Sequence, residues 1–156
     1  MGYVAAVATP VDPATSVAID AIVEESHRAL DAFFKGDANP VKPLFSRRDD
    51  VTLANPFGPP RRGWAEVEET MEGAAANYRD GAVVGFEEVS RYVTPELAYI
   101  VEVEHYQAKV GGSDEVTPVS LRCTTILRRE SDGWKIVHRH ADPITAARPA
   151  ESVIPT

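Results

Sequence analysis

Two histidines and an aspartate near the end of the chain have the spacing of a small chemical site. His138, His140 and Asp142 alternate along one predicted strand, so their side chains should point to the same face. An imidazole can move a proton near neutral pH, and a neighbouring carboxylate can orient it or act as the base. We therefore predict that these three residues are the catalytic candidates.

A second set of residues could bind a ligand beside these three. Arg122 and Thr124 share one face of the preceding predicted strand, and a guanidinium can clamp a carboxylate or an enolate. Asn55, at the end of a short earlier strand, would add an amide, and His105 is a further candidate. Trp134 should close the apolar end of the same cavity against apolar residues of two helices.

These residues leave several interpretations open. They could form a satisfied internal network with Arg122 paired to Asp142, line a binding pocket without chemistry, or catalyse a reaction. A metal ion between His138 and His140 is also conceivable, but no cysteine cluster or helical histidine pair accompanies them. We expect no metal and no cofactor.

Length and charge narrow the class of protein. The chain has 156 residues, 44% of them hydrophobic, and a formal net charge of −8. This fits one domain with its own core and disfavours nucleic acid as a partner. No apolar run approaches the roughly 20 residues of a membrane span, and we see no secretory signal. The single cysteine, Cys123, excludes an internal disulfide, so we expect a cytoplasmic protein without a membrane partner.

The hydrophobic period changes near residue 80 and divides the chain into helices followed by strands. Apolar residues recur at helical spacing from Ser16 to Gly36 and again after Gly63. Alternation then predicts four strands joined by hairpins, after a short strand at 51–55: 83–93, 99–110, 119–129 and 134–142. This order predicts an α+β fold with helices packed on one face of a curved antiparallel sheet.

The ends of the chain lack such a pattern. We predict an N-terminal arm (1–15), one domain (16–145) and a C-terminal tail (146–156).

The predicted strand 99–110 has two possible orientations. Its apolar residues alternate with Glu102 and Glu104. We expect both glutamates to face solvent, because buried carboxylates are costly unless they are paired. His105 then faces the cavity. The opposite orientation, which would bury both glutamates, stays open.

The run at 132–140, DGWKIVHRH, is similar to the last hairpin of SnoaL-like proteins. The order of the predicted elements resembles that of the nuclear-transport-factor-2-like superfamily, which includes ketosteroid isomerase. The resemblance covers about residues 16–144. It implies a cone-shaped fold with a cavity between the helices and the sheet.

A finer resemblance concerns the catalytic residues of ketosteroid isomerase. The segment Asn55-Pro56-Phe57-Gly58 is similar to that family's Asp-Pro-Val-Gly motif, whose aspartate is the general base. An amide cannot accept that proton at neutral pH. Ala29 and Thr124 stand near the positions of the oxyanion-hole tyrosine and the protonated aspartate. The resemblance therefore argues against steroid isomerisation by that mechanism.

The resemblance implies a protein that binds a small apolar molecule with a polar head. Acid–base turnover of the isomerase, cyclase or hydratase type could accompany binding. The alternative is a non-catalytic assembly or accessory domain. Members of this family usually pair through the convex face of the sheet, which implies a homodimer. We expect Leu121, Cys123 and Val137 to lie on that face.

Overall fold

The two hydrophobic periods produce the helices and strands that the structure contains. The computed structural model describes residues 11–156, so the first ten residues of the predicted arm lie outside the described part of the chain. The helices are α1 (Pro13–Phe33), η1 (Lys42–Leu44), α2 (Trp64–Ala75) and η2 (Ala150–Val153). The strands are β1 (Thr52–Ala54), β2 (Arg61–Arg62), β3 (Tyr78–Val93), β4 (Leu97–Val110), β5 (Thr117–Glu130) and β6 (Gly133–Asp142).

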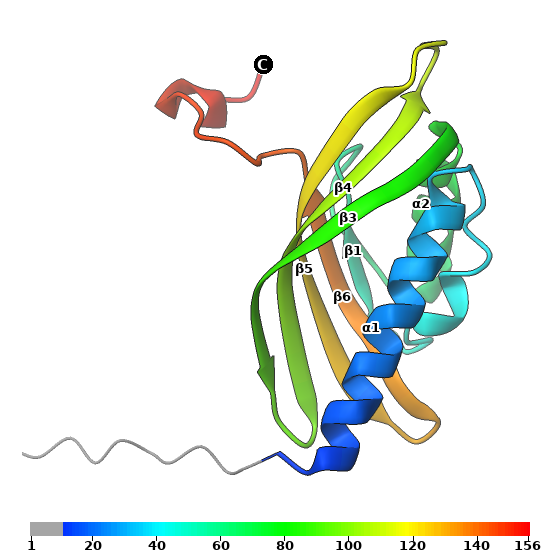
Figure 1. Cartoon of the computed structure of the whole chain (residues 1–156), viewed down its shortest axis with the longest axis vertical. Helices are drawn as coiled ribbons and strands as arrows, with labels where there is room; N and C mark the ends of the chain where they lie inside the picture. The colour runs from blue at the N-terminus through cyan, green and yellow to red at the C-terminus, as the bar shows by residue number, and fades with distance from the viewer. Residues whose placement is uncertain (1–10) are drawn as a thin grey trace, which may run out of the picture.

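The strands form one six-stranded sheet in the order β2-β1-β6-β5-β4-β3. Strands β3 to β6 are joined as antiparallel neighbours, and β1 runs parallel to β6. Figure 1 shows α1 and α2 on the same side of this curved sheet. We call the helix-covered side the concave face and the opposite side the outer face. The predicted α+β fold is confirmed.

Helix α1 begins about one turn earlier than the predicted start at Ser16. Asp12 is its N-cap, and the Asp12 side chain accepts a hydrogen bond of 3.0 Å from the amide of Ala14. Pro13 occupies the first helical position, where a missing N–H group costs nothing. These local signals outweigh the hydroxyl of Ser16 as a cap.

The end of α1 is tied closely to the start of β3. The amide of Gly81 donates to the carbonyl of Phe34 at 3.1 Å, and a β-carbon on Gly81 would lie 2.2 Å from that oxygen. Only glycine permits this approach. Tyr78 opens β3 and is buried.

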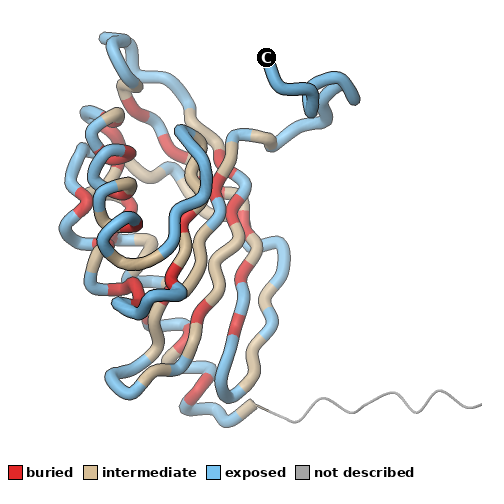
Figure 2. Tube along the Cα trace, turned by 180° about the vertical axis from the view of Figure 1, so that it is seen from behind, coloured by how far each residue is buried: buried red, intermediate tan, exposed pale blue. Residues whose placement is uncertain are grey.

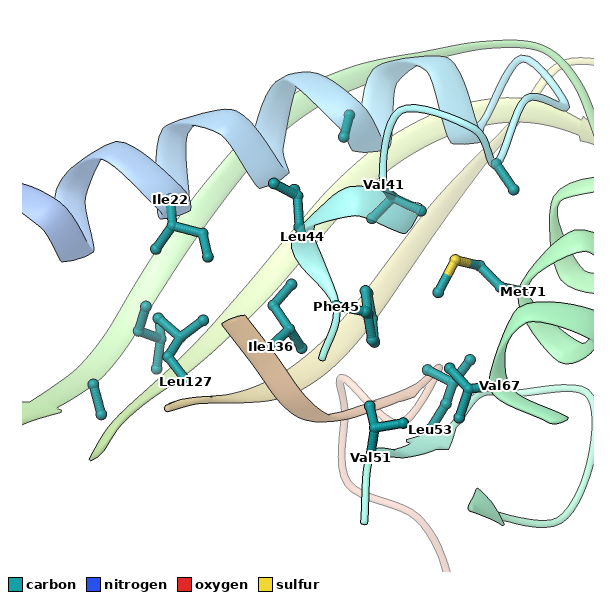
Figure 3. Packing of buried hydrophobic residues seen from close by; sticks show 14 of the residues in the cluster. Ile22, Val41, Leu44, Phe45, Val51, Leu53, Val67, Met71, Leu127 and Ile136 are labelled. Atoms are coloured by element: carbon teal, nitrogen blue, oxygen red, sulfur yellow. The ribbon is translucent and has the colours of Figure 1, made fainter. Parts of the chain in front are cut away.

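Two apolar clusters fill the space between the helices and the concave face. Figure 3 shows the larger one, in which η1, β1 and α2 meet the sheet around Phe45, Met71 and Ile136. Trp134 packs against this cluster while remaining partly exposed. The smaller cluster joins the end of α1 to β3, β4 and β5, with Leu30, Phe34, Tyr78, Tyr106, Leu121 and Cys123 among its members.

A β-bulge in β6 reverses which residues of that strand face the helices. Ile136 pairs with Leu127 and His138 pairs with Ile126, so Val137 is an extra residue without a partner on β5. Ile136 therefore faces the core, while His138 and His140 face outward. The prediction that Trp134 and the three catalytic candidates line the same cavity is wrong for this reason.

The expected orientation of β5 is also wrong. Leu121, Cys123 and Leu127 are buried on the concave face, whereas Arg122 and Thr124 lie on the outer face. Leu121 and Cys123 therefore cannot form the exposed apolar surface that was expected for a dimer.

The expected orientation of β4 is wrong as well. Glu102 and Glu104 are 6% and 0% exposed and point to the concave face. His105 lies on the outer face, where its Nδ1 is 2.8 Å from the hydroxyl of Ser120. Burial of two glutamates requires partners, and one of these partners, Arg139, lines the candidate site.

Candidate functional site

A cavity lies between the end of α1, α2 and the concave face of the sheet. Its volume is about 50 Å³. This is room for more than one water molecule or for part of a small ligand. Most of the lining is apolar, with Leu30, Phe33, Phe34, Leu53, Met71, Leu121 and Ala141 among the residues. Three lining residues carry polar groups: Asn55, Tyr78 and Arg139.

Arg139 is held by a bidentate ion pair with Glu104. Its two terminal nitrogens donate to the two carboxylate oxygens at 2.8 and 2.6 Å. The hydroxyl of Tyr106 donates to the same carboxylate at 2.5 Å. Burial opposes ionisation of Glu104, but the charge and hydrogen bonds of Arg139 lower its pKa to about 2. The pair is thus ionised, and Glu104 is a poor proton acceptor.

Arg139 reaches Glu104 because the strand between them carries a small side chain. Arg139 lies on β6, Glu104 lies on β4, and Cys123 of the intervening β5 contacts the guanidinium with its sulfur at 3.7 Å. Burial raises the pKa of the Cys123 thiol, so the thiol stays protonated and unreactive. Cys123 acts here as a small spacer.

Tyr78 brings a hydroxyl to the cavity near the guanidinium. Burial raises the pKa of Tyr78 to about 12, and the positive charge of Arg139 acts in the opposite direction. The phenol is therefore protonated at neutral pH and can donate a hydrogen bond. No hydrogen bond joins this hydroxyl to any other residue in the range 11–156.

Asn55 and Phe57 lie in the loop at the wall of the cavity. The side-chain oxygen of Asn55 accepts a hydrogen bond of 2.9 Å from the amide of Phe57, which leaves the NH₂ group of Asn55 as a donor. The ring of Phe57 is 48% exposed and lies 5.8 Å from the ring of Tyr78. This loop partly covers the cavity.

The second buried glutamate has a histidine partner that the sequence analysis did not consider. Nε2 of His27, on α1, lies 3.2 and 3.1 Å from the two carboxylate oxygens of Glu102. The imidazole stacks on the ring of Phe86, with the centroids 3.5 Å apart. Together the two pairs satisfy the buried carboxylates of β4.

Three of the predicted site residues do meet, but on the outer face. The Nε of Arg122 donates to Asp142 at 2.7 Å, and Nε2 of His140 lies 3.0 Å from the other oxygen of that carboxylate. Burial disfavours the ionised form of Asp142, but hydrogen bonds from the Ile144 amide and from Arg122 lower its pKa. These residues line an open groove of about 250 Å³ together with Val101, Cys123 and Thr124.

The remaining predicted residues are dispersed. His138 bonds to the hydroxyl of Thr52 at 2.7 Å, and burial followed by the charge of His140 lowers its pKa, which favours the neutral form. Trp134 lies beside Arg129, whose guanidinium is 5.5 Å from the ring centroid, and is not in the cavity wall. Of the eight predicted site residues, only Asn55 lines the cavity.

Within residues 11–156, no three histidine, cysteine or acidic side chains are arranged to hold a metal ion. None of the helices in that range is long and apolar enough to span a membrane.

The cavity residues Arg139 and Tyr78 were missed by the sequence analysis. Glu104, which holds Arg139, was considered only in the orientation of its strand that was left open. One available signal was the plain alternation of Leu121, Cys123 and Leu127, which would have oriented β5 correctly. The pairing of Glu104 with Arg139 has no sequence signal, since the two lie on strands that are not adjacent.

The comparison with protein families places the chain in a known family. The SnoaL-like domain model matches residues 19–145, which is most of the chain. The chain therefore belongs to the SnoaL-like family. The predicted membership of the SnoaL-like family is confirmed.

Solved structures with the same fold include proteins with different descriptions. A protein from Thiobacillus denitrificans, described provisionally as a calcium/calmodulin-dependent protein kinase type II association domain, is 22% identical (TM-score 0.67; 86% of this chain and 98% of that chain covered). A provisionally described dehydratase of the NTF2-like family from Streptomyces avermitilis is also 22% identical (TM-score 0.67; 86% and 100% covered). A ketosteroid isomerase-like protein from Erwinia carotovora atroseptica is 18% identical (TM-score 0.69; 87% and 100% covered).

At these identities the similarity shows the fold alone. No curated protein matches the sequence.

Proposed function

We propose that the chain binds a small, uncharged, mostly apolar molecule whose hydrogen-bond-accepting head meets Arg139 and Tyr78. The observation that carries this proposal is the polarity of the cavity wall. Each of its three polar side chains can donate, through the hydroxyl of Tyr78, the amide NH₂ of Asn55 and the remaining N–H groups of Arg139, whereas only the Tyr78 hydroxyl and the Asn55 oxygen can also accept. A carbonyl oxygen is the simplest acceptor that satisfies such a wall.

The charge balance favours an uncharged head over a carboxylate. The positive charge of Arg139 is already offset by Glu104 at 2.6 Å. A ligand carboxylate would be desolvated beside this neutralised pair and would gain little from it. The body of the ligand would lie against the apolar side chains of α1 and α2.

The same donors could also polarise a bound carbonyl group. Donors aimed at a carbonyl oxygen stabilise the negative charge that develops on it during enolisation or hydration. This is one half of isomerase, cyclase or hydratase chemistry. The other half is a base, and the residues that line the cavity in the described chain include no carboxylate and no imidazole. The proposal therefore extends to binding and polarisation, not to a complete reaction.

Two probes with the same ring system and different heads test this proposal. We expect 2-acetylnaphthalene, a neutral ketone, to bind and 2-naphthoate to bind about tenfold more weakly or worse, measured by ligand-observed NMR. Tyr78→Phe should weaken ketone binding by roughly fivefold to tenfold, because one hydrogen bond is lost. Asp142→Asn, on the outer face, is the matched control and should change nothing. Equal or tighter binding of 2-naphthoate would contradict the proposal.

We also propose that the chain forms a homodimer through the outer face. The support is an apolar strip across β4 and β5 made by Val101, Val103 and Ile126, beside the exposed and stacked rings of Tyr92 and Tyr99. Such a strip is unusual on a sheet that faces only water. Sedimentation that shows a monomer at micromolar concentration would contradict this part.

The alternative function is an assembly or accessory domain without a ligand. The favouring observation is that one solved structure of this fold is described provisionally as a kinase association domain. A sedimentation profile with a species larger than a dimer, together with no binding of either probe, would favour this alternative.

A further inference from the structure

We propose that the C-terminal tail (146–156), together with its root at residues 144 and 145, binds across the outer face of a second copy of the chain. This inference rests on the proposed homodimer and is independent of the ligand cavity. It begins with the position of the tail. Figures 1 and 2 show the tail leaving the end of β6 on the side of the sheet away from the helices and standing clear of the sheet.

The tail has a defined conformation without support from its own domain. Residues 145–156 are all exposed, and the apolar side chains of Val153 and Ile154 are 84% and 64% exposed. The tail ends in the short helix η2, whose hydrogen bonds are internal: the Ser152 amide donates to Pro149 and the Ile154 amide to Glu151, each at 3.0 Å. A single 3₁₀ turn of this kind does not compensate by itself for the loss of chain entropy.

The root of the tail is fixed to the rim of the outer groove. The amide of Ile144 donates to Asp142 at 2.9 Å, and the same carboxylate oxygen accepts from Arg122. Arg148 donates to the carbonyl of Pro143 at 3.4 Å. The prolines at 143 and 149 stiffen the segment further. The tail therefore points away from the groove of its own chain and toward any molecule that packs against the outer face of the sheet.

The outer groove has the chemistry to receive such a segment. Val101 and Thr124 contribute apolar surface, and the cationic or imidazole side chains of Arg122 and His140 are 54% and 51% exposed at the groove. The end of the tail offers the complementary pattern: two adjacent apolar side chains, Val153 and Ile154, preceded by the acidic Glu151. The charge of Arg122 is offset by Asp142, so the match lies in the apolar surface and exposed donor groups of the groove, which meet the apolar side chains and the carboxylate acceptors of the tail.

Two-fold symmetry explains why the tail of a second copy would occupy the outer groove. In a two-fold pair that packs outer face against outer face, each tail projects toward its partner, and both contacts are equivalent. Each tail would then fill the groove of the other copy and bury the side chains that its own domain leaves exposed.

Cross-linking between two different chains tests the contact directly. A chain carrying Ile154→Cys is mixed under oxidising conditions with a differently tagged chain carrying Thr124→Cys. We expect a covalent heterodimer. The matched control is Val17→Cys in place of Ile154→Cys, because Val17 is a 67% exposed residue on α1. The native Cys123 is buried and is present in every sample. Cross-linking no better than that of the Val17→Cys control would overturn the proposal.

Sedimentation equilibrium tests the energetic role of the tail in the full-length chain. The double substitution Val153→Glu and Ile154→Glu should raise the dimer dissociation constant at least about tenfold, since it places two charges against an apolar surface. Val17→Glu should leave the constant unchanged. If the tail variant dimerises as tightly as the parent chain, the tail proposal fails while the dimer stands. If the parent chain is a monomer, both fail, and neither result bears on ligand binding in the cavity.

Discussion

The two faces of the central sheet each carry an arginine–carboxylate pair, and the two pairs differ in how far their side chains are exposed to solvent. On the concave face, the side chains of Arg139 and Glu104 are 12% and 0% exposed. On the outer face, those of Arg122 and Asp142 are 54% and 15% exposed. The inner pair must satisfy itself within the protein, whereas water shares the solvation of the outer pair.

This difference indicates what each pair can do. Glu104 accepts from Arg139 and Tyr106 and is fully committed to them, so the inner pair fixes the shape of the cavity wall. The outer pair retains exposed donor groups and stands at the root of the tail. Burial therefore turns one pair into part of the scaffold and leaves the other available for contacts with a partner.

The largest effect is expected from Glu104→Gln. This change leaves the buried guanidinium of Arg139 without its counter-charge, and we expect a loss of about 3–5 kcal/mol in the free energy of unfolding. Urea denaturation monitored by tryptophan fluorescence measures the loss. A decrease below about 1 kcal/mol would mean that solvent reaches the inner pair and that the two faces are alike.

The pH dependence of the free energy of unfolding distinguishes the two faces in the parent chain as well as in the variants. The pKa of Glu104 falls from an ordinary value of 4.5 to about 2 in the folded chain. A depressed carboxyl pKa stabilises the fold above the ordinary value, and this contribution is lost as the pH falls through the folded value. The parent chain should thus lose stability progressively from about pH 4.5 toward pH 2. Urea denaturation at a series of pH values should show a flatter profile for Glu104→Gln than for Asp142→Asn.

An intermediate effect is expected from Tyr106→Phe. The substitution removes the buried hydroxyl that donates to Glu104 at 2.5 Å but keeps the ring stacked on Phe34. We expect a loss of about 1–3 kcal/mol, because one hydrogen bond to a buried carboxylate disappears. Thermal and urea denaturation should agree on this value. A neutral result would show that a water molecule replaces the hydroxyl.

The smallest effects are expected on the outer face. Asp142→Asn and His140→Ala each remove part of an exposed network, so the loss of stability should stay below about 1 kcal/mol. Thermal denaturation of a dilute sample, in which a dimer would dissociate, measures this contribution within one chain. A loss comparable with that of Glu104→Gln would contradict the contrast between the faces.

Much of the fold could be predicted because its signals are local. The change from helical to strand periodicity near residue 80 predicted the order of elements, and the alternation in 119–129 and 134–142 predicted the last hairpin. The hairpin ending and the element order were also sufficient to identify the SnoaL-like family, which the family comparison confirms. Element ends were less certain, as the early start of α1 at Pro13 illustrates.

The candidate site could not be predicted to the same extent, because strand orientation is a collective property. Shifting a strand's pairing by one residue exchanges its two faces. The extra residue Val137 makes such a shift inside β6, at the point where Phe45 forms a bridge to Ile136 and the Ser46 amide donates to the Ile136 carbonyl at 2.9 Å. No local pattern in residues 134–142 predicts this β-bulge.

The sequence by itself determined the types and order of the helices and strands, the hairpins and the family, since periodicity and turn residues act over a few positions. Only the tertiary structure decided that Arg139, rather than His138 or His140, reaches the cavity. It also decided that Glu104 is tolerated in the core. Both outcomes depend on pairing between strands distant in the chain: a buried charge is stable only where a partner arrives from elsewhere, here across the small side chain of Cys123.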